Sequence, residues 1–95
     1  MIRVVVAEDS PTARQLLVAM LESDPGVRVV GEAATGRDAV ELVERLAPDL
    51  VTMDVEMPGL DGLSATREIM VRRPTPIIVV SSQVQERSVA LSFEA

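Results

Sequence analysis

Four short apolar runs recur at nearly even spacing along the chain, and the segments between them have a different, helical period. The runs cover residues 4–7, 27–30, 50–53 and 77–80. From one run to the next, the distance is the length of one strand, one helix and two loops. The pattern therefore predicts strands that alternate with helices.

The first two intervening segments carry start signals for helices. Ser10 is placed to cap the first helix, Pro11 fits its first position, and Thr35 can cap the second. Apolar residues fall three and four positions apart in both segments: Ala13, Leu16, Leu17, Met20 and Leu21 in the first, and Ala39, Val43, Leu46 and Ala47 in the second. Both segments are therefore expected to be amphipathic helices.

Two further helices are predicted in the second half of the chain. The third is expected to run from Asp61 or Gly62 to Arg72. The residues expected to face inward in it are Leu63, Thr66, Ile69 and Met70. A weaker pattern predicts a fourth helix over residues 83–95.

The strands are apolar on both faces, which is typical of a parallel sheet covered by helices on two sides. We therefore predict an α/β, doubly wound, flavodoxin-like sheet with the strand order 2-1-3-4. A continuous 1-2-3-4 order would leave one face of the sheet uncovered. A chain of 95 residues makes one domain, 1–95.

The composition narrows the chemistry. The chain has no Cys and no His, so a metal ion would need oxygen ligands, which favours Mg²⁺, Mn²⁺ or Ca²⁺. The net charge of −6 argues against a nucleic-acid surface. There is no apolar run long enough for a membrane span and no signal peptide, so we expect a cytoplasmic protein. All nine cationic residues are Arg.

Polar residues follow the strands that are predicted to be neighbours. Glu8 and Asp9 come after the first strand, Asp54 ends the third, and Ser81 and Ser82 end the fourth. In doubly wound sheets, ligands bind beyond the carboxyl ends of the strands, where the strand order reverses. Three carboxylates are therefore expected to face one small cleft.

Such a cluster needs a counterion. Two unit charges about 4 Å apart repel by about 4 kcal/mol at an effective dielectric constant near 20. Mg²⁺ fits, since it uses one or two carboxylates and shares its other positions with water and phosphate oxygens. We assign Asp9 and Asp54 as direct ligands, with Glu8 direct or through water. An Asp in such a site can also act as a nucleophile and form an aspartyl-phosphate.

Each of these residues also has an ordinary structural explanation. Asp9 or Ser10 can simply cap the following helix, the turn after Asp54 can recruit that carboxylate, and a hydroxyl such as Ser81 is common at the end of a strand. Their shared location at neighbouring strand ends favours the site.

Taken together and in order, these residues resemble the response-regulator receiver domains of two-component signalling. The resemblance covers the whole chain and is carried by Glu8-Asp9, Asp54, Met57-Pro58-Gly59, Asp61-Gly62 and Ser81. The stretches VTMDVEMPGLDGL and RPTPIIVVSS are most similar to the regulatory domain of chemotaxis methylesterase response regulators.

The resemblance implies a function for several residues. Asp54 would be the phosphoacceptor and would receive a phosphoryl group from a sensor histidine kinase. Glu8, Asp9 and Asp54 would hold Mg²⁺ or Mn²⁺ together with the backbone carbonyl of Glu56. Ser81 would be the switch hydroxyl that moves the loop before the fourth helix.

Pro58 and Gly59 would shape the loop after the acceptor, where a closely approaching backbone favours Gly. The switched strand 4 and helix 4 surface would control an output domain or a downstream protein, such as a chemotaxis methylesterase. The chain itself would catalyse only its own phosphoryl transfer and hydrolysis, without a methylesterase domain in these residues.

One feature departs from the family. Receiver domains have a Lys at the end of a fifth strand and then a last helix, whereas this chain stops at Ala95 and contains no Lys. Three explanations are open: a fragment, completion by another chain, or a degenerate receiver. The first is favoured because LSFEA ends inside a predicted helix without a stop signal.

Without a fifth strand, strand 4 would be an uncovered edge, so we expect dimerisation or domain swapping through it. The alternative function is a pseudo-receiver that docks partners without phosphorylation, which the missing Lys favours and the acidic residues disfavour. A phosphatase or a flavin-binding module is less consistent with the sequence. A phosphatase would need a cap, and a flavin site would need stacking aromatics, whereas Phe93 is the single aromatic residue.

Overall fold

The computed structural model describes residues 1–81 and 88–92, with the backbone alone for Ser81 and for 88–92. The elements follow in the order β1 (Ile2–Ala7), α1 (Pro11–Glu22), β2 (Val27–Ala33), α2 (Gly36–Leu46), β3 (Leu50–Asp54), α3 (Gly62–Arg72), β4 (Ile77–Ser81) and β5 (Ser88–Ser92). Up to β4 this is the predicted alternation of strands and helices.

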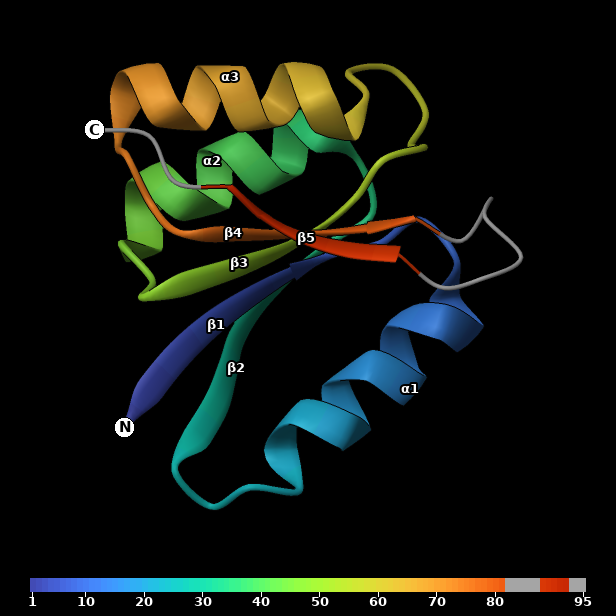
Figure 1. Ribbon diagram of the computed structural model, residues 1–95, viewed down its shortest axis with the longest axis vertical. Coiled ribbons are helices and arrows are strands. Elements are labelled where there is room, and N and C mark those ends of the chain that lie inside the picture. Colours follow the sequence, from blue (N-terminus) through green and yellow to red (C-terminus); the bar gives the residue numbers. More distant parts are fainter. Residues whose placement is uncertain (82–87, 93–95) are drawn as a thin grey trace.

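The parallel strands have the predicted order β2-β1-β3-β4. Helices α2 and α3 cover one face of the sheet, and α1 lies on the other face (Figure 1). The order reverses at β1, which pairs with both β2 and β3. Ala7 in β1 is in register with Met53 in β3. The next residues, Glu8 and Asp54, are therefore side by side at the carboxyl ends of the two strands.

The three helices begin at side-chain caps. The caps are Ser10, Thr35 and Asp61, whose side chains accept hydrogen bonds from backbone N–H groups three residues later at 3.3, 3.1 and 2.8 Å. Pro11 occupies the first position of α1, as predicted. These caps satisfy N–H groups that have no partner inside a helix.

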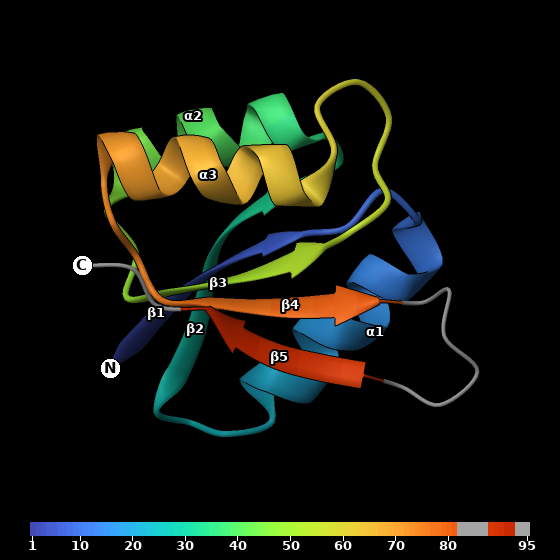
Figure 2. The same ribbon diagram turned by 45° about the horizontal axis from the view of Figure 1, so that its top comes forward.

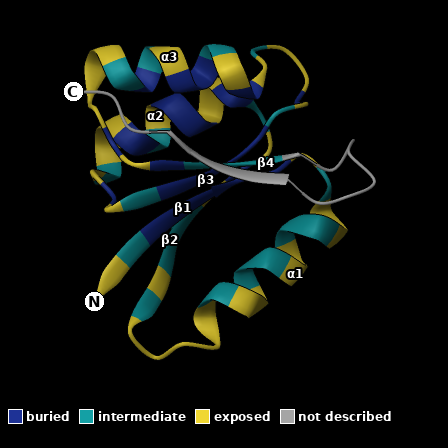
Figure 3. Ribbon diagram, in the orientation of Figure 1, coloured by how far each residue is buried: buried dark blue, intermediate teal, exposed yellow. Residues whose placement is uncertain are grey.

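The hydrophobic core lies between the sheet and the α2–α3 pair (Figure 3). Its largest fully buried side chains are Val5, Val40, Val43, Val51, Met53, Ile69 and Ile77. In contrast, α1 has no buried residue, and the side chains of Leu16 and Met20 are 59% and 61% exposed. The apolar residues of α1 therefore form a face that the sheet buries only in part.

The prediction that Leu63 faces inward is wrong. Its side chain is 49% exposed. The buried residues of α3 are Gly62, Ala65, Thr66 and Ile69, which are three, four and seven positions apart and form one face, and Leu63 lies next to this face instead of on it. The other inward residues were predicted correctly: Thr66 and Ile69 are buried and Met70 is half-buried.

The predicted fourth helix is wrong over residues 88–92, which form β5, while the remainder of residues 83–95 lies outside the described residues. β5 pairs with β4 in the antiparallel direction (Figure 2). Only six residues connect these strands, and a parallel pairing needs a crossover of about a dozen or more. Pairing also satisfies backbone groups along β4, an advantage that a local helical pattern does not reveal.

The expectation of an uncovered strand 4 edge is corrected by the same finding. β4 pairs with β3 on one side and with β5 on the other. The structural basis for dimerisation or swapping through that edge is therefore lost. Within the described residues, no helix combines the length and the apolar content needed to cross a membrane.

Candidate functional site

Three carboxylates gather at the carboxyl end of the sheet, as predicted. Glu8 and Asp9 follow β1, and Asp54 is the last residue of β3. Each offers one carboxylate oxygen, and these oxygens all lie within 4.8 Å of one another. Glu8 and Asp54 are 7% and 3% exposed, whereas Asp9 is exposed.

Glu8 is fixed through its backbone and through its side chain. Its N–H donates to the carbonyl of Ala33 in β2 at 2.9 Å, and its own carbonyl accepts from Nη1 of Arg14 at 2.8 Å. Its carboxylate Oε2 accepts from the N–H of Ser10 at 3.1 Å. The first acidic residue of the cluster is therefore held by β2 and by the start of α1.

Asp54 is joined to the neighbouring strand and helix through the residue that follows it. The N–H of Val55 donates to the carbonyl of Val80 in β4 at 3.2 Å, and the carbonyl of Val55 accepts from the N–H of Gly62 at 2.9 Å. Asp54 Oδ1 accepts from the N–H of Glu56 at 3.3 Å. The backbone around this carboxylate is thus tied to β4 and to the start of α3.

The cluster is electrostatically unfavourable when all three groups are ionised. At a separation near 5 Å, each pair of charges repels by about 3 kcal/mol at an effective dielectric constant of 20. Burial, with smaller contributions from Asp54 and Asp9, raises the pKa of Glu8 to about 7, although the N–H of Ser10 acts in the opposite direction. Without a cation, Glu8 therefore retains a proton up to neutral pH.

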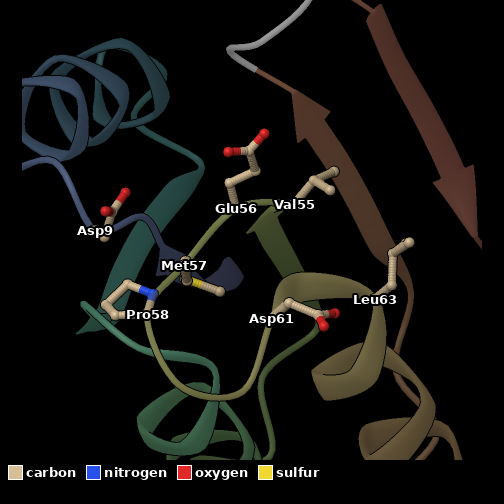
Figure 4. Close-up of a pocket in the computed structure, with 7 residues that line it drawn as sticks. All are labelled: Asp9, Val55, Glu56, Met57, Pro58, Asp61 and Leu63. Carbon is tan, nitrogen blue, oxygen red and sulfur yellow. The ribbon is translucent and has the colours of Figure 1, made fainter.

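A pocket of about 640 Å³ opens beside the cluster (Figure 4). Its lining residues are Asp9, Val55, Glu56, Met57, Pro58, Asp61 and Leu63. Asp61 also caps α3, and the N–H of Ser64 holds the pKa of this carboxyl below its usual range. The Asp61 carboxylate is thus engaged by the helix, whereas Asp9 belongs to the cluster.

The other predicted site residues lie around this pocket. Glu56 and Pro58 are exposed in the loop after β3, and Ser81 is the last residue of β4. Since Asp54 is in register with Val80, the backbone of Ser81 lies one residue beyond that pair. The side chain of Ser81 is outside the described part of the structure.

The expected reason for Gly59 is corrected. Among the described residues, and apart from its two chain neighbours, a Cβ atom at this position would meet no atom within 4 Å, so none of their backbone approaches it closely. Instead, Gly59 has a φ of 75°, in the left-handed region that favours glycine. The loop after Asp54 therefore needs Gly59 for its backbone conformation.

The donor set fits a hard divalent cation. All candidate ligands are oxygen atoms, their spacing permits them to share one ion, and two of the three carboxylates are shielded from water. Mg²⁺ and Mn²⁺ prefer such ligands, whereas softer metals prefer nitrogen and sulfur.

Two contacts that shape the site are not evident from the sequence. Arg14 donates to the carbonyl of Glu8, and a backbone partner leaves no signature in a sequence. Gly62 has its backbone against Asp54. The sequence predicts that a helix starts at Asp61-Gly62, but the close approach to Asp54 follows only from the tertiary structure.

Comparison with known proteins connects this geometry to a family. Residues 4–95 match the response regulator receiver domain. The chain is 57% identical over 94 residues to protein-glutamate methylesterase/protein-glutamine glutaminase 4 of Myxococcus xanthus, covering 99% of this chain and 26% of that protein. It is 54% identical over 95 residues to a protein of the same kind from Anaeromyxobacter dehalogenans, covering 100% of this chain and 28% of that protein. The chain thus spans about a quarter of the length of these relatives.

Solved structures agree with the sequence match. The response regulator domain of Thermotoga maritima CheB superimposes with a TM-score of 0.86 at 45% identity, covering 90% of this chain and 64% of that one. The receiver domain of a Pseudomonas aeruginosa sensor histidine kinase, with a magnesium ion coordinated in its active-site cleft, gives 0.79 at 38% identity, covering 90% and 70%. The fold, the acidic cluster and these matches lead to one conclusion: the chain belongs to the response regulator receiver domain family, and it is related to the regulatory domain of CheB methylesterases.

Proposed function

We propose that this chain is a phosphoacceptor receiver in which Asp54 takes a phosphoryl group from the phosphohistidine of a sensor histidine kinase. The observation that carries the proposal is the convergence of the Glu8, Asp9 and Asp54 carboxylates in a chain of this family. In the transfer, a carboxylate oxygen of Asp54 forms a bond to phosphorus while the bond from phosphorus to the histidine nitrogen breaks. The imidazole leaves and takes up a proton from water.

The residues that would hold Mg²⁺ or Mn²⁺ are Glu8, Asp9, Asp54 and the backbone carbonyl of Glu56. When bound, the cation would offset the negative charge on the carboxylates and on the transferring phosphoryl group. The protein contributes position: Glu8 and Asp54 are held by backbone hydrogen bonds, and Asp9 lines the open pocket through which a donor can approach. Pro58 and Gly59 would shape the loop after β3, part of which lines that pocket.

Phosphorylation would act on β4 through the hydrogen bond from Val55 to Val80. Ser81, the next residue, is the proposed switch hydroxyl that would bond the new phosphoryl oxygens and move the end of β4. The described part of the segment after β4 contains β5 instead of the expected helix, so the surface that responds would include the β4–β5 pair. In a longer protein, this surface would control an output such as the methylesterase activity named for the relatives.

The direct test is intact mass spectrometry after incubation with acetyl phosphate and Mg²⁺. We expect the added mass of one phosphoryl group in the wild type and in Asp49→Asn, and no addition in Asp54→Asn. Asp49 is a suitable control because it lies before β3, at the opposite end from the cluster, and accepts a hydrogen bond from the N–H of Arg3.

The pseudo-receiver without phosphorylation remains the second candidate because the chain has no Lys. Absence of the adduct from the wild type, and also from a longer form of the chain that contains a Lys, would support this second function. An adduct that persists in Asp54→Asn would contradict the assignment of the acceptor.

A further inference from the structure

Arg14 connects three segments beside the acidic cluster. It lies in the first turns of α1, its Nη1 donates to the carbonyl of Glu8 after β1 at 2.8 Å, and its Nε lies 3.3 Å from Oε1 of Glu32 in β2. The Arg14 side chain is only 21% exposed, whereas the Glu32 side chain is 47% exposed. The guanidinium is therefore a partly buried bridge.

The carbonyl that Arg14 holds belongs to the peptide that leads into Asp9. The ladder between β1 and β3 ends at Ala7, and the carbonyl of Glu8 lies beyond it. The orientation of this peptide determines the direction in which the Asp9 side chain leaves the backbone. Asp9 is the exposed member of the cluster, so packing restrains it less than it restrains Glu8 and Asp54.

We propose that Arg14 is a positioning residue for the cation site: it fixes the peptide between Glu8 and Asp9 and so holds the Asp9 carboxylate toward the other two. The inference rests on the proposed function, since it concerns the same site. Arg14 acts through the backbone of Glu8 and is not assigned a contact with the cation or the phosphoryl group.

The positioning role of Arg14 and its positive charge predict opposite changes in Mg²⁺ affinity when the residue is replaced. A positive guanidinium near the cluster weakens the attraction of the site for a divalent cation, so removing the charge alone would strengthen Mg²⁺ binding. Loss of positioning would weaken binding, because Asp9 would sample directions away from the site. The sign of the change in affinity therefore separates the two roles.

The experiment is isothermal titration of Mg²⁺ into the wild type, Arg14→Gln, Arg14→Lys and Glu32→Gln. Arg14→Gln is expected to raise the dissociation constant roughly tenfold, as for other residues that orient metal ligands. Arg14→Lys should show most of the same loss, because one ammonium group does not reproduce the planar fork of Arg. Glu32→Gln leaves the bond to Glu8 in place, so its change should stay below about threefold.

A second readout uses the metal-free protein. Backbone amide NMR is expected to show faster hydrogen exchange at Glu8, whose N–H donates to Ala33 at 2.9 Å, in Arg14→Gln, with exchange in β3 unchanged. If Arg14→Gln does not fold, Arg14→Lys decides the question.

A folded Arg14 variant that binds Mg²⁺ as tightly as the wild type, or more tightly, would overturn the inference while leaving the proposed function intact. A wild type that binds no Mg²⁺ would contradict the proposed cation site, and this inference with it.

Discussion

The backbone of Gly62 lies against the carbonyl group of Asp54 so closely that a Cβ atom at position 62 would overlap that oxygen. The same glycine donates its N–H to the carbonyl of Val55 at 2.9 Å, and its own carbonyl accepts from the Thr66 hydroxyl at 2.8 Å. The start of α3 is therefore built directly onto the end of β3. The shape of the acidic site depends on this contact, because Asp54 is a member of the cluster.

Replacing Gly62 by Ala should therefore be costly. The added methyl group would meet backbone atoms that cannot rotate away, so we expect Gly62→Ala to lower the free energy of unfolding by about 2 kcal/mol or more. Urea unfolding followed by far-UV circular dichroism measures this change. Gly26→Ala is the matched control, since the nearest described atom to its Cβ, apart from its chain neighbours, would be in the Asp24 side chain, at 3.3 Å. Equal stability of the two variants would contradict the close approach.

Without divalent cations, the protein should lose stability as the pH rises from 5 to 8. The pKa of Glu8 is about 7 in the folded chain, against an ordinary value of 4.5. Between these values, the folded state keeps a proton that the unfolded state has lost, so raising the pH favours unfolding. The stabilisation is fully present below about 4.5 and is lost as the pH passes through 7, with a total of roughly 1 to 3 kcal/mol.

Urea unfolding at several pH values in the presence of a chelator measures this slope. Glu8→Gln should flatten it, because the amide does not titrate. Glu41→Gln, which removes an exposed carboxylate on α2, should keep the wild-type slope. A free energy of unfolding that increases from pH 5 to pH 8 in the wild type would contradict a raised pKa of Glu8 in the folded chain.

Because the core lies beneath α2 and α3, the same Val→Ala substitution should change stability by very different amounts at a buried and at an exposed position. Val43 on α2 is fully buried, whereas Val71 on α3 is 83% exposed. Val43→Ala should lower the free energy of unfolding by roughly 1 to 3 kcal/mol through lost burial and a residual cavity, while Val71→Ala should change it by less than about 0.5 kcal/mol. Thermal unfolding provides the comparison, and similar losses in both variants would be inconsistent with a core beneath α2.

Much of the fold could be predicted because local and global signals agree. The four apolar runs became β1 to β4, and the caps Ser10 and Thr35 begin the first two helices. The gathering of acidic residues also followed from sequence, since the carboxyl ends of adjacent parallel strands meet at one edge.

The remaining features depend on partners that are distant in sequence. Residues 88–92 contain Val, Ala and Leu, which are compatible with a helix or a strand, and the free side of β4 decides between them. The exposure of Leu63 follows from the face that α3 turns to the core, and the need for glycine at position 62 follows from the close approach of α3 to the backbone of Asp54. The bond from Arg14 to Glu8 uses a backbone carbonyl, which every residue possesses.

The account depends most on the claim that the Glu8, Asp9 and Asp54 carboxylates form one site that binds a divalent cation. Titration of the wild type and of Asp9→Asn with Mg²⁺, followed by backbone amide NMR, tests this claim most directly. We predict saturable shifts concentrated at Glu8, Asp9, Asp54 and Glu56, with much weaker binding in Asp9→Asn. Amide signals of these residues that do not move with Mg²⁺, or that move equally in both proteins, would contradict it.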